Sequence, residues 1–317
     1  NYQFSDNFSI KFGRQEIIYD DSRIFGNVGW AQQARSFDAA IVKFKTSENG
    51  KLDIGFSLNN DSEQLTNSLY SNTAGYKTFQ YAWYHTNIDN FGISFLALNN
   101  GVEFLNANTK EELNYSQTIG SRATYKIGSF SLDGSVYFQT GKLLGNSISA
   151  SYYGGNLNYK ASEQFKLGIG VEYLSGKDMN DTSAKIKSFN PFYGTNHKFN
   201  GFMDYFYVGN HINSVGLLDI YGSVGYSKNK FSAKVIPHIF SSAADIYDGA
   251  NKVNNSLGTE IDLVFGYKIS KNVAFNAGYS KMFGTKSLEV IKGGDNSADN
   301  SWTWLMLTFK PAIFASK

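Results

Sequence analysis

The sequence has no cysteine, only three prolines among its 317 residues, and no long apolar run. Without cysteine the chain can form neither a disulfide nor a thiolate metal site. A membrane-spanning helix needs roughly 18 consecutive apolar residues, and no segment approaches that length. Basic and acidic residues nearly balance, at 29 Lys and Arg against 27 Asp and Glu, which argues against a nucleic-acid-binding surface.

Catalytic and metal-binding patterns are also missing. None of the four histidines has metal-ligand spacing such as H-E-x-x-H. A membrane-embedded hydrolase would need a serine, a histidine and an orienting polar residue together on an outer face, and only His85 and His238 come near this requirement. We therefore expect no enzyme activity, no metal site and no cofactor.

Aromatic residues and glycine, by contrast, are abundant. The sequence is 16% aromatic and holds 31 glycines, while its mean hydropathy is only -0.32. A transmembrane β-barrel has this composition because only every second residue has to face lipid. The first residues show neither the basic start nor the apolar stretch of a signal peptide, so we expect that a leader was removed or that the chain starts late.

Apolar and polar residues alternate with a period of two in many segments. In 52–58 and 167–173, for example, Leu, Ile, Val, Phe and Tyr alternate with Gly, Ser and charged residues. The polar face is small or charged in segment after segment, as a water-filled lumen requires and the inside of a soluble sandwich does not. The pattern predicts an all-β fold, namely a transmembrane antiparallel up-and-down β-barrel.

About fourteen strands can be identified, separated alternately by short turns and long connections. Short periplasmic turns and long extracellular loops are typical of bacterial outer-membrane barrels. We therefore expect one domain over 1–317 with both chain ends in the periplasm, and the longest loop near 175–213. The predicted strands lie near 8–18, 37–46, 51–59, 76–86, 90–99, 113–126, 130–140, 147–159, 165–174, 214–227, 231–240, 256–268, 272–283 and 302–310.

Three motifs resemble the alginate-export family of outer-membrane channels, here in a form like that of the Bacteroidetes. They lie at Gly13–Asp38 (G-R-Q-E, D-x-R and W-x-Q-x-x-R-S-F-D), at Phe189–Asp204 (F-x-P-x-Y-G-x-x-H with G-x-x-D after it), and at Trp302–Pro311 (W-x-W-x-M-L-T-x-K-P). The family's barrels have about eighteen strands. The resemblance thus implies either a shorter relative or a chain without some N-terminal strands.

Arginine is rare and clustered. Arg14, Arg23 and Arg35 lie within one 26-residue stretch, and Arg122 is the fourth and last. Since the guanidinium fork binds carboxylates through two contacts, we predict that these arginines line a path for anions. The alternative, which is compatible with the first, is that they tie down the loop through Glu16, Asp20, Asp21 and Asp38.

Each arginine has a predicted place. Arg122 falls on the polar face of its strand and should lie in the lumen. Strict alternation would put Arg14 on the lipid side, but a β-bulge at Gly13 would turn it inward. Arg23 and Arg35 flank a long loop and should sit at the outer mouth.

The lumen should carry mixed charge with a local preference for anions. Lysines and acids share the polar faces, and we predict Lys43 and Lys126 among the pore-lining residues. The polar faces also carry Lys45, Lys51 and Lys166, together with Asp53, Asp133, Glu172, Glu260 and Asp262.

The 175–213 loop is long enough to fold on its own, so we predict a constriction or lid that includes Tyr193, His197 and Asp204. Whether it enters the lumen is open at this stage.

We therefore predict a porin-like channel for passive transport of hydrophilic, anionic saccharides. Alginate or oligouronates are implied only by the resemblance, and the direction of transport is open. The expected surroundings are membrane lipid and lipopolysaccharide. The alternative is a plugged structural barrel that docks other envelope proteins, with the 175–213 loop as plug.

Overall fold

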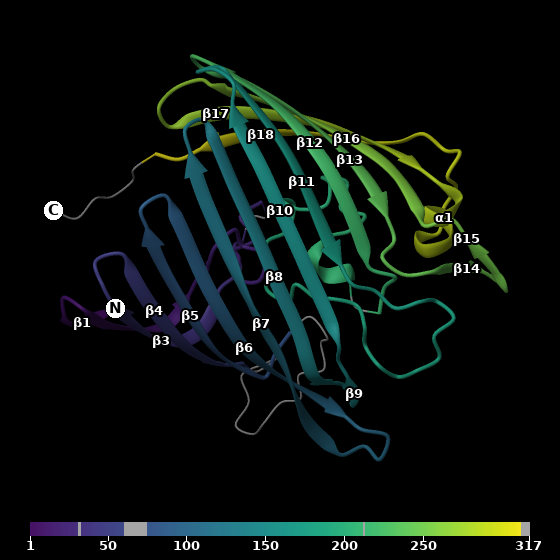
Figure 1. Ribbon diagram of the computed structural model, residues 1–317, viewed down its shortest axis with the longest axis horizontal. Coiled ribbons are helices and arrows are strands. Elements are labelled where there is room, and N and C mark those ends of the chain that lie inside the picture. The colour runs from purple at the N-terminus through teal and green to yellow at the C-terminus, as the bar shows by residue number, and fades with distance from the viewer. Residues whose placement is uncertain (31–32, 60–74, 212, 312–317) are drawn as a thin grey trace.

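The protein is built almost entirely from one curved antiparallel sheet (Figure 1). The computed structural model describes residues 1–30, 33–59, 75–211 and 213–311. In these residues the only helices are the single 3-10 turn η1 (Val208–Asn210) and α1 (Lys286–Lys292). No helix in the described ranges is long and apolar enough to cross a membrane.

All fourteen predicted strands are confirmed, each as one long strand. They are β2 (Phe8–Gln15), β3 (Phe37–Lys45), β4 (Gly50–Leu58), β5 (Thr78–Ile88), β6 (Phe91–Leu105), β7 (Glu111–Ile127), β8 (Phe130–Leu143), β10 (Ala150–Lys160), β11 (Phe165–Leu174), β12 (Leu217–Lys228), β13 (Phe231–Ser241), β16 (Ser256–Lys268), β17 (Val273–Gly284) and β18 (Asn300–Phe309).

Four further strands are short, and only β9 overlaps a predicted strand, at the start of 147–159. They are β1 (Tyr2–Ser5), β9 (Asn146–Ser147), β14 (Ile246–Asp248) and β15 (Asn251–Val253). The last two form a separate hairpin within one of the long connections.

Two of the connections expected to be long, 100–112 and 141–146, are wrong. In 141–146, β8 continues to Leu143, which pairs with Asn146 of β9 across a two-residue turn. The 100–112 segment is mostly strand, because the β6–β7 ladder continues without a break to the Leu105–Glu111 pair and leaves only a five-residue turn.

Successive strands pair in chain order from β1 to β18, as an up-and-down barrel requires, and β9 pairs beside β8. In the described part of the chain no ladder joins β1 to β18. The N-terminal strands (purple) and β18 (yellow) are therefore the two edges of the curved sheet in Figure 1.

The two faces of the sheet differ as the alternation predicts. Large apolar side chains stand exposed on the outside, including Phe12 (82% exposed), Ile169 (63%) and Leu305 (72%). The inner face carries acids that are wholly buried, such as Asp219, Glu260 and Asp262. Exposed apolar outside and buried charge inside is the reverse of a soluble protein and is the arrangement of a barrel in lipid.

Two long connections fold inward and bury the inner acids. We call residues 16–30 the first inner loop and residues 175–211 the second inner loop. They meet in an aromatic cluster in which Phe25 of the first stacks on Tyr193 of the second, with ring centroids 5.4 Å apart. Phe37 and Phe79 from the inner faces of β3 and β5 pack against both rings.

A matched pair of lysine substitutions tests which face of the sheet meets lipid. Ile169→Lys places a charge at the middle of β11 on the outside and should lower the free energy of unfolding by about 2–4 kcal/mol. Asn158→Lys, beside Gly168 on the inner face, should change it by less than about 1 kcal/mol. Urea unfolding in lipid vesicles measures both. Equal losses for the two variants would contradict the assignment of the outer face to lipid.

Candidate functional site

The tip of the first inner loop is a tight turn held against the inner wall. The Ser22 amide donates to the Tyr19 carbonyl at 2.9 Å, and Asp20 and Ser22 both have positive φ. Asp20 accepts hydrogen bonds from Trp83 Nε1 at 3.1 Å and Ser94 Oγ at 2.5 Å. Burial raises the pKa of Asp20 above its usual range, although these two hydrogen bonds act against the shift.

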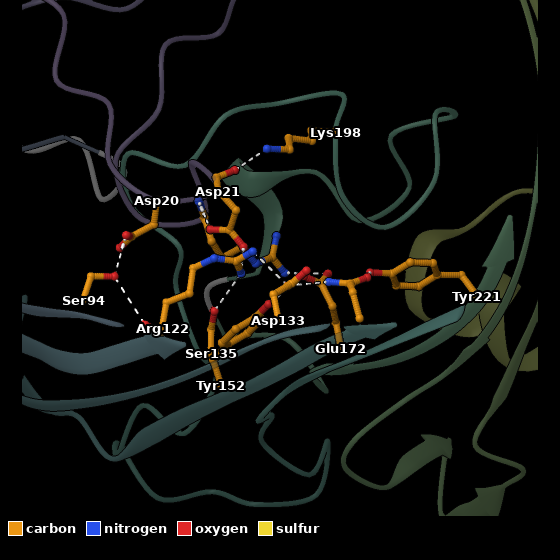
Figure 2. Close-up of polar contacts among 12 residues, drawn as sticks. Asp20, Asp21, Ser94, Arg122, Asp133, Ser135, Tyr152, Glu172, Lys198 and Tyr221 are labelled. Atoms are coloured by element: carbon orange, nitrogen blue, oxygen red, sulfur yellow. Dashed lines mark hydrogen bonds and ion pairs between the residues drawn. The ribbon is translucent and has the colours of Figure 1, made fainter. Parts of the chain in front are cut away.

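Arg122 holds the other side of this tip. Its guanidinium lies 2.7 Å from Asp21 of the loop and 2.8 Å from Asp133 of β8, and it also donates to Ser135. Figure 2 shows it reaching from β7 between these partners. The residue thus lies on the inner face, where the alternation placed it. It pairs with Asp21, one of the loop acids named in the tethering alternative.

Arg23 is not at an outer mouth, contrary to our prediction, because the loop turns inward and carries this residue with it. Its side chain is 1% exposed and lies 3.3 Å from Glu172 on the inner face of β11. It donates to Asn200 of the second inner loop and lies over the Tyr152 and Phe199 rings, at 5.0 and 4.5 Å. Arg23 therefore joins both inner loops to the wall.

The predicted bulge at Gly13 is also wrong. The β2–β3 register is uniform from Phe8 to Gln15, although Gly13 itself has a φ of 106°. Arg14 accordingly stays on the same outer face as Phe12 and pairs with Asp38 at 2.8 Å, with its side chain 75% exposed. It lines no part of the lumen.

Arg35 is half-buried and donates to the Gly194 carbonyl at 2.8 Å, so it fastens the connection before β3 to the second inner loop. Burial lowers the pKa of Arg35. Like Arg122 and Arg23, this arginine holds an inner loop in place.

The second inner loop spans the lumen and is anchored on several strands. Asn190 exchanges hydrogen bonds with Gln139 of β8, while Asn200 donates to Glu172. At its tip the Phe202 and Met203 amides donate to Asp262 and Glu260 of β16, at 3.2 and 2.9 Å. These contacts lie on the inner face of the sheet. The loop therefore enters the lumen, which the sequence had left open.

The three predicted constriction residues all belong to this inward part. Tyr193 is buried and donates to Asn100 of β6. His197 Nδ1 lies 2.9 Å from Asp204, and the His197 ring packs between Trp30 and Trp302, with centroids at 4.5 and 5.1 Å. All three predicted residues therefore help to hold the loop in place. Of the three, only Asp204 is substantially exposed, at 41% of its side chain.

Two cavities flank the tip of the first inner loop. The central cavity, about 330 Å³, is bounded by Arg122, Lys198 and Lys234 together with the amide and hydroxyl groups of Asn156, Asn158, Tyr221 and Ser223. The side cavity, about 570 Å³, is bounded by Lys43, Lys45, Lys51, Trp83 and His85. Asp20 faces the side cavity and Asp21 the central one, so this turn separates them.

Lys198 and Lys234 are cavity residues that the sequence analysis missed. The alternation of β13 could have identified Lys234, which shares its inner face with His238, whereas Lys198 comes from a loop without periodicity. Lys198 donates to the Asp21 carbonyl, and burial lowers its pKa. Of the predicted lysines, Lys43 lines the side cavity, but Lys126 lies by the β7–β8 turn and lines neither.

Comparison with known families decides the relationship. The alginate export family model matches residues 2–217. The chain belongs to the alginate export family. A comparison with curated protein sequences gave no match.

Solved outer-membrane proteins share the fold of this alginate export family member. OccAB4 of Acinetobacter baumannii is 14% identical with a TM-score of 0.64, over 96% of this chain and 72% of that one. OccK11 (OpdR) and OpdK of Pseudomonas aeruginosa, the latter solved with vanillate, are 13% and 12% identical with TM-scores of 0.61, over 96% of this chain and 77% and 76% of theirs.

The buried Arg23–Glu172 pair can be tested by a double-mutant cycle. Arg23→Met leaves a buried carboxylate without its counter-charge and should lower the free energy of unfolding by about 3 kcal/mol. Glu172→Gln should have a similar effect, and the double variant should lose clearly less than the sum. Urea unfolding in detergent measures all three. Strictly additive losses would show that the two side chains act independently.

His211 should make the second inner loop sensitive to acid. It is 3% exposed, and burial lowers its pKa from 6.5 to about 3, with nearby Arg23 and Lys292 acting in the same direction. The stability that comes from keeping His211 neutral is present above about pH 6.5 and is lost as the pH falls toward 3. Between pH 6.5 and 5 the loss should be about 1.6 kcal/mol.

The comparison for His211 is His211→Gln, which stays neutral at every pH. Unfolding curves at pH 6.5 and 5 should show a smaller drop for this variant than for the parent protein. An identical drop in both would assign the acid sensitivity to other groups.

Proposed function

We propose that this protein is an integral outer-membrane channel through which hydrophilic, anionic saccharides diffuse, without a cofactor and without covalent chemistry. The observation that carries the proposal is the central cavity. It lies between the inner loops and the wall and combines three basic side chains with several amide and hydroxyl groups. A sugar acid offers the matching groups, namely a carboxylate and many hydroxyls.

Lys234 is the cavity's clearest candidate for anion contact. Arg122 is occupied by Asp21 and Asp133, and Lys198 by a loop carbonyl. Lys234 has no ion-pair partner within the described residues and projects from the inner face of β13. A cation on a low-dielectric wall attracts anions into a channel. The neighbouring acids should keep this preference moderate.

A structural relative supports an anionic ligand. OpdK was solved with vanillate, which carries a carboxylate, and this chain has the same fold. The family supports a saccharide, since its description is alginate export. The direction of transport follows from neither observation.

The membrane orientation is part of the proposal. Short turns lie at one end of the barrel, such as 128–129 between β7 and β8 and 229–230 between β12 and β13. Short turns are typical of the periplasmic side, so both chain ends lie there and the long connections start from the extracellular end. The whole chain then acts as a single barrel domain surrounded by lipid and lipopolysaccharide.

A plugged barrel that docks other envelope proteins is the second candidate. It is favoured by the packing of the two inner loops, whose Phe25 and Tyr193 are almost fully buried against each other and the wall. In that case the loops would close the lumen permanently.

Single-channel recording in a planar bilayer separates the two candidates. Stable openings with a reversal potential favouring anions, and block by oligouronates but not by neutral sugars, are expected for the channel. A correctly folded but silent barrel would overturn the channel and favour the plug.

Lys234→Gln should weaken the anion preference of the open channel. Loss of one charge-assisted contact worth about 1.4 kcal/mol should weaken oligouronate block about tenfold, measured as the concentration for half-block. Lys110→Gln removes the same charge from the exposed β6–β7 turn and is the matched control. Equal block in both variants would place Lys234 off the permeation path.

A further inference from the structure

The side cavity contains two lysines that lie directly opposite each other on neighbouring strands. Lys45 of β3 and Lys51 of β4 are directly opposite in register, and Lys51 is in turn opposite His85 of β5. All three point to the inner face, because each lies two residues from an inner-face neighbour. Three neighbouring strands thus present a row of basic side chains.

Two like charges directly opposite on neighbouring strands destabilise a sheet. Within the described residues neither Lys45 nor Lys51 forms an ion pair, whereas Lys43 in the next row lies 3.5 Å from Asp53. The buried Nδ1 of His85 likewise has no hydrogen-bond partner in the described chain. The row therefore has unused capacity to bind an anion.

The chain contains a comparable pair that is neutralised. Lys160 and Lys166 are opposite on the inner faces of β10 and β11, but Glu163 lies 2.6 Å from Lys160. Repulsion between opposed lysines is thus relieved there by the protein itself. At Lys45 and Lys51 no acid of the described chain relieves the repulsion, so a bound anion could do so.

The surrounding geometry keeps the row accessible. Lys51 Nζ lies 4.9 Å from the centre of the Trp83 ring, which packs against Tyr19 on the loop tip. Two of the nearby acids are engaged elsewhere, Asp53 with Tyr19 and Lys43, and Asp20 with Trp83 and Ser94. A third, Asp6, also lines the cavity but forms no ion pair with Lys45 or Lys51 in the described residues. A cavity of about 570 Å³ is within the range that holds a small ligand.

We propose that Lys45, Lys51 and His85 form a second anion-binding site, which takes the carboxylate of a saccharide acid at the short-turn end of the barrel. The tip of the first inner loop separates it from the central cavity. The anion follows from the opposed lysines, whereas the saccharide rests on the proposed function. The channel would then hold two units of an acidic chain on either side of the Asp20–Asp21 turn.

Calorimetric titration of the detergent-purified full chain with a defined oligouronate tests the site. Lys45→Gln and Lys51→Gln should each weaken binding about tenfold, the effect of losing one charge-assisted contact. Each should also leave the melting temperature unchanged or raise it, because the repulsion is removed. A purely structural lysine would lower both binding and stability, and that result would overturn the proposal.

Lys166→Gln is the matched control, since it removes one lysine from the neutralised pair. It should leave oligouronate affinity unchanged. Equal affinity of the parent and the Lys45→Gln/Lys51→Gln double variant would overturn the site. Inorganic phosphate binding as tightly as the oligouronate would overturn the saccharide assignment.

Bilayer recordings on the same preparations separate this site from the proposed function. A silent barrel that still binds oligouronate through Lys45 and Lys51 would leave the site standing and remove the channel. A conducting channel whose affinity for oligouronate does not depend on these lysines would overturn the site and leave the proposed channel function standing.

Discussion

Glu172 is the point at which both inner loops meet the barrel wall. Its carboxylate accepts from Tyr152 of the neighbouring strand at 2.6 Å and from Asn200 of the second loop at 2.7 Å, and it pairs with Arg23 of the first loop. A carboxylate that is 3% exposed is costly unless its oxygens are fully used. Three partners from three segments meet that requirement, so displacing either loop would leave a buried charge without its partner.

This arrangement divides the basic residues between two tasks. Three arginines act in holding loops: Arg23 and Arg122 through carboxylates, Arg35 through a carbonyl. A planar fork suits such fixed contacts, because it is pre-organised and loses less freedom per hydrogen bond. Among the described residues, Lys45, Lys51 and Lys234 face the cavities without an ion-pair partner. A lysine on a flexible stem can follow a passing ligand, which an arginine fixed in a salt bridge cannot.

The strands could be predicted from the sequence and the loops could not, for a physical reason. Alternation is a local signal that lipid imposes on every strand, so all fourteen long strands and the inward placement of Arg122 and Lys43 follow from it. The partners of Arg23 lie about 150 residues or more away, at Glu172 and Asn200, and no period links them. The prediction that Arg14 faces the lumen was wrong for the opposite reason. The alternation was right, and the uniform β2–β3 register excludes the bulge that we invoked to override it. On the outer face the Arg14 guanidinium pairs with Asp38.

The separation of the two cavities bears on how such a channel would work. Conduction needs binding strong enough for entry but weak and multiple enough for exit. A single site with all the arginines free would hold an acidic chain too tightly. Here Arg122 is neutralised by Asp21 and Asp133, and Arg23 by Glu172. The remaining lysines are divided between two cavities by one turn of the first loop. On the proposal made above, each site would be weak and a chain released from one would lie next to the other, so the ion pairs that fix the loops would also set the spacing of the sites.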